Sequence, residues 1–208
     1  IAVTGFRVGE LLEQPNLGSV SCEAGLNGVV GKGLIDARVD GSVSQLEFNG
    51  YDYDSLRFGG RLTEKTFNGH VRADDPALRF DFQGEVGFNP ERPHYDFDLD
   101  LIHADLARMH LNRRDSVSVL SALVEARASG RTLDDLNGKV TVGDVVYRYN
   151  ADTLHTTRLT LDGQNSAGSK YLSLQSEFAD ATFRSRTDYK TVFEYLRSSL
   201  EKYIPLLY

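Results

Sequence analysis

The fold class is decided by Leu78-Arg-Phe-Asp-Phe-Gln-Gly-Glu-Val-Gly-Phe88 and by the run that follows it, Tyr95-Asp-Phe-Asp-Leu-Asp-Leu101. In both runs, large apolar residues alternate with charged or polar ones. A period of two is typical of a β-strand with one apolar face and one solvated face. The break between the runs contains Pro90 and Pro93, so the two strands are predicted to be antiparallel neighbours. The apolar face is aromatic and large, and it must pack against something.

Similar alternation continues along the rest of the chain, in short pieces separated by Gly, Asn and Asp. Turn signals at intervals of roughly ten residues are typical of an antiparallel all-β meander. Further strands are expected over residues 2–8, 17–25, 34–40, 116–128, 139–149, 156–162, 170–176 and 181–186.

A short unit, a large apolar residue followed by any residue and then Gly, recurs along the chain. It occurs as Leu26-Asn-Gly28, Phe48-Asn-Gly50, Phe58-Gly-Gly60, Phe67-Asn-Gly69, Phe82-Gln-Gly84 and Leu136-Asn-Gly138. Glycine within a strand pattern usually marks a bulge or a bend, and repeated bends curl a sheet. Ordinary hairpin turns are the alternative explanation. We predict a curled antiparallel sheet.

A fainter repeat divides the chain into two similar units, residues 1–100 and 101–188, each with a strand, a short corner helix and a meander. The period then changes: between residues 189 and 204 apolar residues recur at spacings of three and four. This pattern predicts a terminal amphipathic helix. We expect it to pack against one end of the sheet; a lid or a membrane-surface helix is the alternative.

Composition excludes several functions. The net charge of −7 argues against nucleic acid and against anionic membrane surfaces as partners. Cys22 is the only cysteine, so no internal disulfide is possible. No apolar run approaches the roughly 18–20 residues of a membrane-spanning helix, and no signal peptide opens the sequence. We therefore expect a segment of a longer protein, with targeting or anchoring sequences outside it.

Catalytic chemistry is not expected, nor is a metal or a cofactor. The alternating aspartates from Asp96 to Asp100 lack the Gly and Glu of a calcium loop, and Gly31-Lys-Gly33 lacks the remainder of a phosphate loop. No specific spacing relates the remaining candidates, which are His94, His103, His110 and the carboxylates Asp74, Asp75 and Glu85. The sequence predicts a protein that is not an enzyme.

The sequence resembles a family of bacterial envelope proteins. The similarity is carried by five stretches of strand residues and glycines: Phe48–Leu62, Phe67–Val86, Tyr95–Leu106, Gly130–Val140 and Lys170–Ala181. Together they are similar to the AsmA-like group, and most of all to TamB, a family named for the translocation and assembly module. The likeness covers nearly the whole chain, but it consists of a strand pattern and contains no catalytic signature.

Membership of that family would imply a definite function. Its members are anchored in the inner membrane, cross the periplasm and consist of a long curled sheet, the β-taco, with an apolar groove. They are implicated in phospholipid transport to the outer membrane and in outer-membrane assembly with a barrel protein. The resemblance thus implies a periplasmic segment of a lipid conduit. Its partner here would be phospholipid or another acyl-chain amphiphile, and the barrel partner would meet other parts of the full-length chain.

Alternation and resemblance together predict which residues line the groove. They are Leu46, Phe48, Phe58, Phe80, Phe82, Phe88, Phe97, Leu99, Leu101, Val140, Val142 and Leu161. The same residues would also suit the dry core of a closed β-sandwich with nothing bound. In that alternative the chain is a scaffold module that pairs with protein partners through its sheet edges. A carbohydrate-active enzyme ranks last.

Overall fold

The computed structural model of the protein describes residues 2–7, 16–31, 34–166 and 169–189. Thirteen strands occur in this part of the chain, and all of them belong to one antiparallel sheet. Their bounds are β1 Ala2–Arg7, β2 Leu17–Gly31, β3 Leu34–Phe48, β4 Tyr51–Tyr53, β5 Leu56–Thr63, β6 Thr66–Asp74, β7 Leu78–Gly87, β8 His94–Asp105, β9 Ser118–Ser129, β10 Asn137–Tyr149, β11 Asp152–Ser166, β12 Ser169–Ser176 and β13 Asp180–Ser185.

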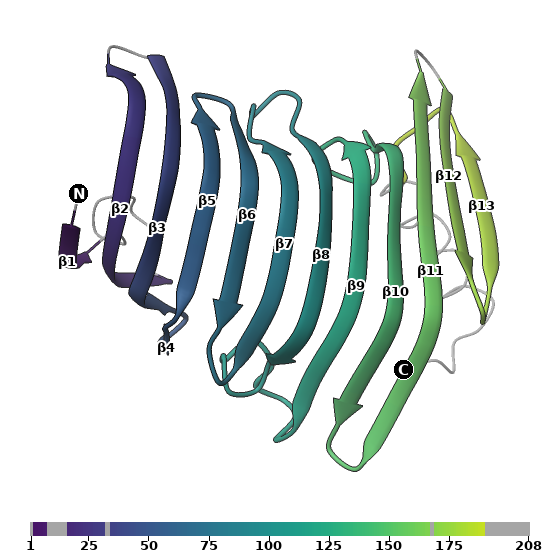
Figure 1. Ribbon diagram of the computed structural model, residues 1–208. Coiled ribbons are helices and arrows are strands. Elements are labelled where there is room, and N and C mark those ends of the chain that lie inside the picture. Colours follow the sequence, from purple (N-terminus) through teal and green to yellow (C-terminus); the bar gives the residue numbers. More distant parts are fainter. Residues whose placement is uncertain (1, 8–15, 32–33, 167–168, 190–208) are drawn as a thin grey trace.

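The strands follow one another in space as they do in the sequence (Figure 1). Each pairs with the next along the chain, except that the short β4 pairs only with β3, which also pairs with β5. The sheet does not close on itself, since β1 and β13 lie at its two opposite edges. The prediction of a curled antiparallel all-β fold is confirmed.

The two runs that suggested the fold are neighbours. Strands β7 and β8 pair antiparallel, with Phe82 opposite Leu99 and Phe80 opposite Leu101. The alternation of the sequence therefore places their apolar side chains on one face of the sheet and their aspartates on the other.

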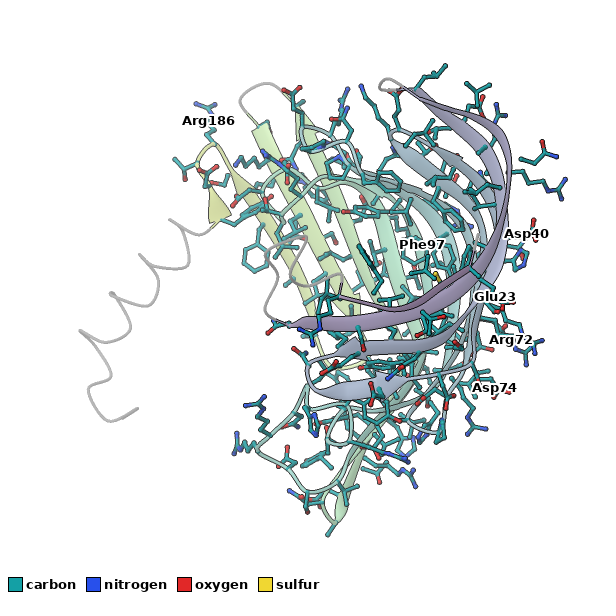
Figure 2. All side chains as sticks on the ribbon, turned by 90° about the vertical axis from the view of Figure 1, so that its left-hand side faces the viewer. Glu23, Asp40, Arg72, Asp74, Phe97 and Arg186 are labelled. Atoms are coloured by element: carbon teal, nitrogen blue, oxygen red, sulfur yellow. The ribbon has the colours of Figure 1, made fainter. Side chains whose placement is uncertain are left out.

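That apolar face is the inside of the curl. Figure 2 shows Phe97 inside the curved sheet, whereas Glu23, Asp40 and Arg72 point away from its outer surface. We call the two sides the concave face and the convex face. Because directly paired residues in a ladder point to the same side, one row of the concave face can be followed across seven strands. It consists of Phe58, Val71, Phe82, Leu99, Val124, Val142 and Leu159.

The core under this face is thin. In the described part of the chain the buried apolar residues are mostly alanines, such as Ala73, Ala122 and Ala126, while Phe82 and Phe97 are only partly shielded. The largest side chains that are almost completely shielded belong to Asp75 and Ser118, which are polar. A closed sandwich would bury its aromatic residues between two sheets. The described strands form a single layer, so the closed-sandwich alternative does not describe this fold.

Glycines occupy the middle of the concave face. Gly60, Gly69 and Gly84 lie directly opposite one another on β5, β6 and β7, and Phe97 of β8 completes the row. A Cβ atom at Gly69 would stand 2.7 Å from the Cα atom of Gly60. On the inner side of a curl the backbones leave little room for side chains, and glycine relieves this crowding.

The repeated glycines were expected to mark bulges or bends, and the curl expected from them is present, but no bulge occurs at them. The shifts in strand register lie elsewhere, for instance between Leu101 and Ala104 and between Gly143 and Val146. Four of the six repeated units lie within strands. The unit that ends at Gly138 begins one residue before β10, and the unit that ends at Gly50 forms the turn between β3 and β4. The glycines act by leaving out a Cβ atom in a regular ladder.

Other expectations have mixed outcomes. The first corner helix and the terminal helix of residues 189–204 lie outside the described residues, apart from Tyr189. The second corner is not a helix, because Ile102–Asp105 continue β8 and Leu106–His110 form turns. The boundary expected near residue 100 falls inside β8, and the sheet continues through it.

We expect Gly84→Ala to lower the free energy of unfolding by roughly 2–4 kcal/mol. Gly84 has a φ of +142°, and a Cβ atom there would lie 2.5 Å from the Cα atom of Phe97. Gly143→Ala is the control, because its Cβ atom would meet nothing closer than the Thr157 carbonyl oxygen at 3.5 Å. Urea unfolding followed by circular dichroism measures both. Equal stability of the two variants would contradict the crowding argument.

Candidate functional site

Nine of the twelve residues predicted to line a groove lie on the concave face in the central strands. Phe58, Phe82, Leu99 and Val142 share the row described above. The other five are Phe97, Val140 and Leu161, which share the row of the glycines, and Phe80 and Leu101, which face each other one row further on. The rings of Phe82 and Phe97 are 5.1 Å apart. Sequence alternation thus located a continuous apolar surface.

Three predicted residues lie outside these central rows. Leu46 and Phe48 are at the end of β3, where the concave face deepens into a pocket. Phe88 follows the last residue of β7, and 46 % of its surface is exposed. Its amide donates to the Lys65 carbonyl oxygen in the loop region beyond β7. The prediction for Phe88 extends the alternation of β7 one step beyond the end of the strand.

The convex face carries the charges. The guanidinium of Arg61 forms two hydrogen bonds of 2.7 Å with Asp36, and these lower the pKa of that carboxyl. Arg127 pairs with Asp96 and Asp98 at 2.8 and 3.0 Å. The aspartates of β8 therefore belong to a solvated face, as their alternation indicated. Exposed pairs of this kind contribute little to stability, but they keep one side of the sheet wetted.

An apolar pocket of about 400 Å³ opens at one end of the concave face, between side chains of β2, β3, β4, β5, β7 and β8. The end of β3, the short β4 and the end of β8 lie at the lower edge of the sheet in Figure 1. We call this cavity the end pocket. Its lining comes from strand ends and from the turn after β8: Leu17, Leu46, Phe48, Tyr53, Leu56, Leu78, Leu101, Ala104, Leu106, Met109 and Leu111. All of these side chains are apolar except for the hydroxyl of Tyr53. The end pocket can therefore hold an apolar ligand, with the Tyr53 hydroxyl as the polar group of its lining.

A buried carboxylate fixes one side of the end pocket. Asp75 is 1 % exposed and accepts hydrogen bonds from the Tyr51 hydroxyl at 2.9 Å and from the amides of Asp54 and Ala77 at 3.1 and 2.7 Å. Burial, followed by the hydrogen bond to Asp75, raises the pKa of Tyr51 to about 12. The Tyr51 ring meets that of Tyr53 edge-on at 4.8 Å. A satisfied polar cluster of this kind holds β4 and the turn before β7 in one arrangement.

The turn after β8 covers the end pocket and is held by its own backbone. The Met109 amide donates to the Asp105 carbonyl oxygen at 2.9 Å, and the Leu111 amide donates to that of Leu106 at 2.8 Å. The His110 Nδ1 atom lies 3.0 Å from the carbonyl oxygen of Asn49, which joins this turn to the one between β3 and β4. Two turns distant in sequence therefore form one wall.

A second apolar cluster lies at the opposite end of the sheet, where β9 ends and β10 begins (Figure 1). Its buried members are Ala128, Leu136, Leu172 and Tyr189, and the predicted groove residues Val140 and Leu161 pack against it. The Tyr189 amide donates to Asp134 at 2.5 Å, and the same carboxylate pairs with Lys170 at 3.3 Å. Lys170 also pairs with Asp188. We call this the upper cluster.

Asp135 shapes the loop that supports the upper cluster. Burial acts to raise the pKa of this carboxyl, but hydrogen bonds from the Arg131 amide at 2.9 Å and the Thr132 amide at 2.7 Å outweigh it. The resulting pKa is about 2. The Asp135 carboxylate closes the loop by accepting these hydrogen bonds, and the closed loop holds the adjacent Leu136 in the upper cluster.

Two of the histidines singled out in the sequence, His94 and His110, lie within hydrogen-bonding distance of other residues of the chain. The His94 Nε2 atom lies 2.6 Å from the Glu85 carboxylate across β7 and β8, and His110 contacts a carbonyl oxygen as described. No group of three or more metal-ligating side chains occurs in the residues that the structure describes. No helix in the same residues is long and apolar enough to span a membrane.

Comparisons with known protein families, with curated proteins and with solved structures find no match to this chain. The likeness to the TamB family therefore stays a prediction from the sequence. What the chain does must be argued from the concave face and its two ends.

Sequence reasoning missed the two ends. Leu56 and Leu78 carried the strand signal, but nothing marked them as walls of a pocket. Met109 and Leu111 lie in a turn without any period, and Asp75 belongs to an acidic pair that composition alone made unremarkable. Their roles arise from contacts between residues far apart in sequence, which periodicity cannot report.

The Asp135 loop predicts a pH dependence of stability. Folding lowers the pKa of Asp135 from 3.8 to about 2. The ionised carboxylate therefore stabilises the folded protein fully at pH values above the unfolded-state pKa, and this stabilisation is lost as the pH falls through the folded-state pKa. We expect Asp135→Asn to lower stability at neutral pH by about 1 kcal/mol, after allowance for solvent screening.

Thermal unfolding between pH 7 and pH 2 measures this effect. The difference between wild type and Asp135→Asn should shrink between about pH 4 and pH 2. Asp152→Asn is the control, since Asp152 is exposed and forms no ion pair within the described part of the chain. A difference that persists unchanged at pH 2 would contradict the assigned cause.

Proposed function

We propose that this chain is a periplasmic segment of a lipid conduit, in which the concave face shelters the acyl chains of phospholipid. The observation that supports this best is a broad apolar surface on the inside of a curled single-layer sheet, whose central rows are covered by no other described element. The likeness of the sequence to TamB supports the same role, and it supports placing the segment between an inner-membrane anchor and an outer-membrane barrel partner.

The large apolar side chains of the concave face are only partly shielded from water. Phe58, Phe82 and Phe97 are half-buried and lie on the concave face of β5, β7 and β8, where the rings of Phe82 and Phe97 are 5.1 Å apart. Burying apolar surface away from water is favourable by about 25 cal/mol per Å². Binding of an acyl chain along this face is therefore favourable, because it buries apolar surface of both the sheet and the lipid. The face continues from strand to strand without a charged residue in the row of Phe82 between β5 and β11. A lipid can therefore lie across several strands.

Substitution at the centre of the face tests the proposal. We expect Phe82→Asp to reduce bound phospholipid by at least about tenfold, because a carboxylate in an acyl-chain site must be desolvated. Gln83→Asp is the matched control, with the same new side chain on the same strand but on the exposed, convex side. Native mass spectrometry after incubation with phosphatidylglycerol or phosphatidylcholine measures binding, and circular dichroism checks the fold.

Two results would count against the conduit. One is a wild-type chain that binds no phospholipid under these conditions. The other is binding that Phe82→Asp and Gln83→Asp leave equally intact, since the lipid would then lie elsewhere. If Phe82→Asp unfolds, Phe58→Asp replaces it in the same row.

A scaffold function is the second candidate, and the open sheet favours it. Among the described residues, β1 and β13 each pair with one neighbouring strand, so they form the two edges of the sheet, where backbone hydrogen-bonding groups can face outward. Such edges bind extended segments of other chains. This function does not exclude lipid binding, because a conduit built of several segments needs edges that join them.

Edge pairing has a separate test. We expect Thr182→Pro in β13 to reduce binding of extended peptides, or self-association, while leaving phospholipid binding unchanged. Proline removes a backbone donor and is poorly accommodated where a further strand must pair. Analytical ultracentrifugation and peptide titration compare it with Thr182→Ala. If the two variants behave alike, the β13 edge is not the interaction surface.

A further inference from the structure

We propose that the end pocket holds one acyl chain of an anionic phospholipid, and that the arginines of the turn covering it bind the phosphate. This inference rests on the proposed function and names a fixed site within it. The turn is defined as residues 106–114, and it has an apolar side and a cationic side. The rest of the concave face would guide lipid, whereas this site would retain it.

The apolar side of the turn forms part of the pocket wall. Leu106, Met109 and Leu111 line the cavity together with side chains from β3, β4, β7 and β8. Its volume of about 400 Å³ lies within the range of small-molecule sites. A lining without charged groups suits a hydrocarbon chain and excludes a polar head group, which would lose its hydration there.

The pocket is preformed by hydrogen bonds outside its lining. Asp75 holds Tyr51 and the residues before β7, and His110 holds the turn against Asn49. Ser118, 0 % exposed, accepts from the Asn112 amide group at 3.0 Å, and its hydroxyl lies 3.0 Å from that of Tyr147. A rigid empty site loses little conformational entropy when a ligand enters it.

The cationic side of the turn is unusual for this protein. Arg108, Arg113 and Arg114 fall within seven residues of a chain whose net charge is −7. None of the three forms an ion pair with a described residue. The flanking carboxylates accept hydrogen bonds from other groups: Asp105 accepts from the Arg108 amide at 3.0 Å, and Asp115 accepts from Asn112 and Asn150 at 3.0 and 2.9 Å. Asp115 also interacts electrostatically with Arg114.

The two sides of the turn are close to each other. The Arg108 guanidinium lies over the Tyr51 ring, 5.8 Å from its centre, and that ring contacts Tyr53 of the pocket wall. Arg108, His110 and Arg113 also line a polar hollow of about 420 Å³ on this turn, together with the carboxylates Asp105 and Asp115. Guanidinium groups suit phosphate oxygens because they donate two parallel hydrogen bonds. An apolar cavity beside arginines without ion pairs matches an anionic amphiphile.

The position of the acyl chain is tested by photo-crosslinking to the whole chain. The probe is phosphatidylglycerol with a diazirine near the end of one acyl chain, and peptide mass spectrometry locates the label. We expect the main label between residues 101 and 111. Leu56→Trp, which fills the cavity from β5, should reduce that label several-fold. Leu123→Trp is the control, because it places the same ring on an exposed leucine that does not line the pocket.

The head-group contact has its own test. We expect Arg108→Gln combined with Arg113→Gln to weaken binding of phosphatidylglycerol about tenfold and to remove its advantage over phosphatidylcholine. Arg148→Gln combined with Arg158→Gln removes the same charge at exposed positions on β10 and β11 and should have little effect.

The outcomes separate this site from the proposed function. If wild type binds lipid through Phe82 but the label falls only on β9–β12, the end pocket is not the site and the conduit stands. If wild type binds no phospholipid, both proposals fail together. If the Arg108→Gln/Arg113→Gln and Arg148→Gln/Arg158→Gln variants weaken phosphatidylglycerol binding equally, the arginines of the turn do not bind the phosphate, even if the acyl chain occupies the end pocket. Photo-crosslinking of the wild-type chain alone shows whether the acyl chain occupies the end pocket.

Discussion

The fold depends on how closely the backbones approach one another on the inner side of the sheet. Gly60, Gly69 and Gly84 stand in one row there, and a single Cβ atom in that row would collide with the next strand. Phe97 lies beside Gly84 and covers the backbone that the glycines expose. Without this row the sheet would have to flatten, and its apolar face would lose the shelter that the curl provides.

A single curled layer has an energetic consequence. It leaves aromatic side chains such as Phe82 and Phe97 only partly covered, whereas a second layer would cover them. The ends of the sheet are packed more fully than its middle: the two clusters there contain most of the larger buried apolar side chains, namely Tyr53, Met109, Leu136, Leu172 and Tyr189. Buried polar groups such as Asp75 and Ser118 fix the loops around them. The open middle and the fixed ends are together the physical basis of the function we propose.

Much of the site could be predicted from periodicity. Alternation located Phe58, Phe82, Phe97 and Leu99 on one face, because side chains in a strand point to opposite sides by geometry alone. Alternation fails where a strand ends, and for that reason it misplaces Phe88. It also cannot separate a bulge from a regular ladder, since both contain the same glycine; only the pairing of Gly84 with Phe97 distinguishes them.

The sequence by itself determined that the chain is all-β, antiparallel and apolar on one face, because these properties depend on near neighbours in the chain. Tertiary structure alone decided that the face is open and not closed into a sandwich, since that depends on whether a second layer packs against it. It also decided where the end pocket lies. Asn49 and His110, or Tyr51 and Asp75, meet only when distant turns come together, and no local pattern encodes such contacts.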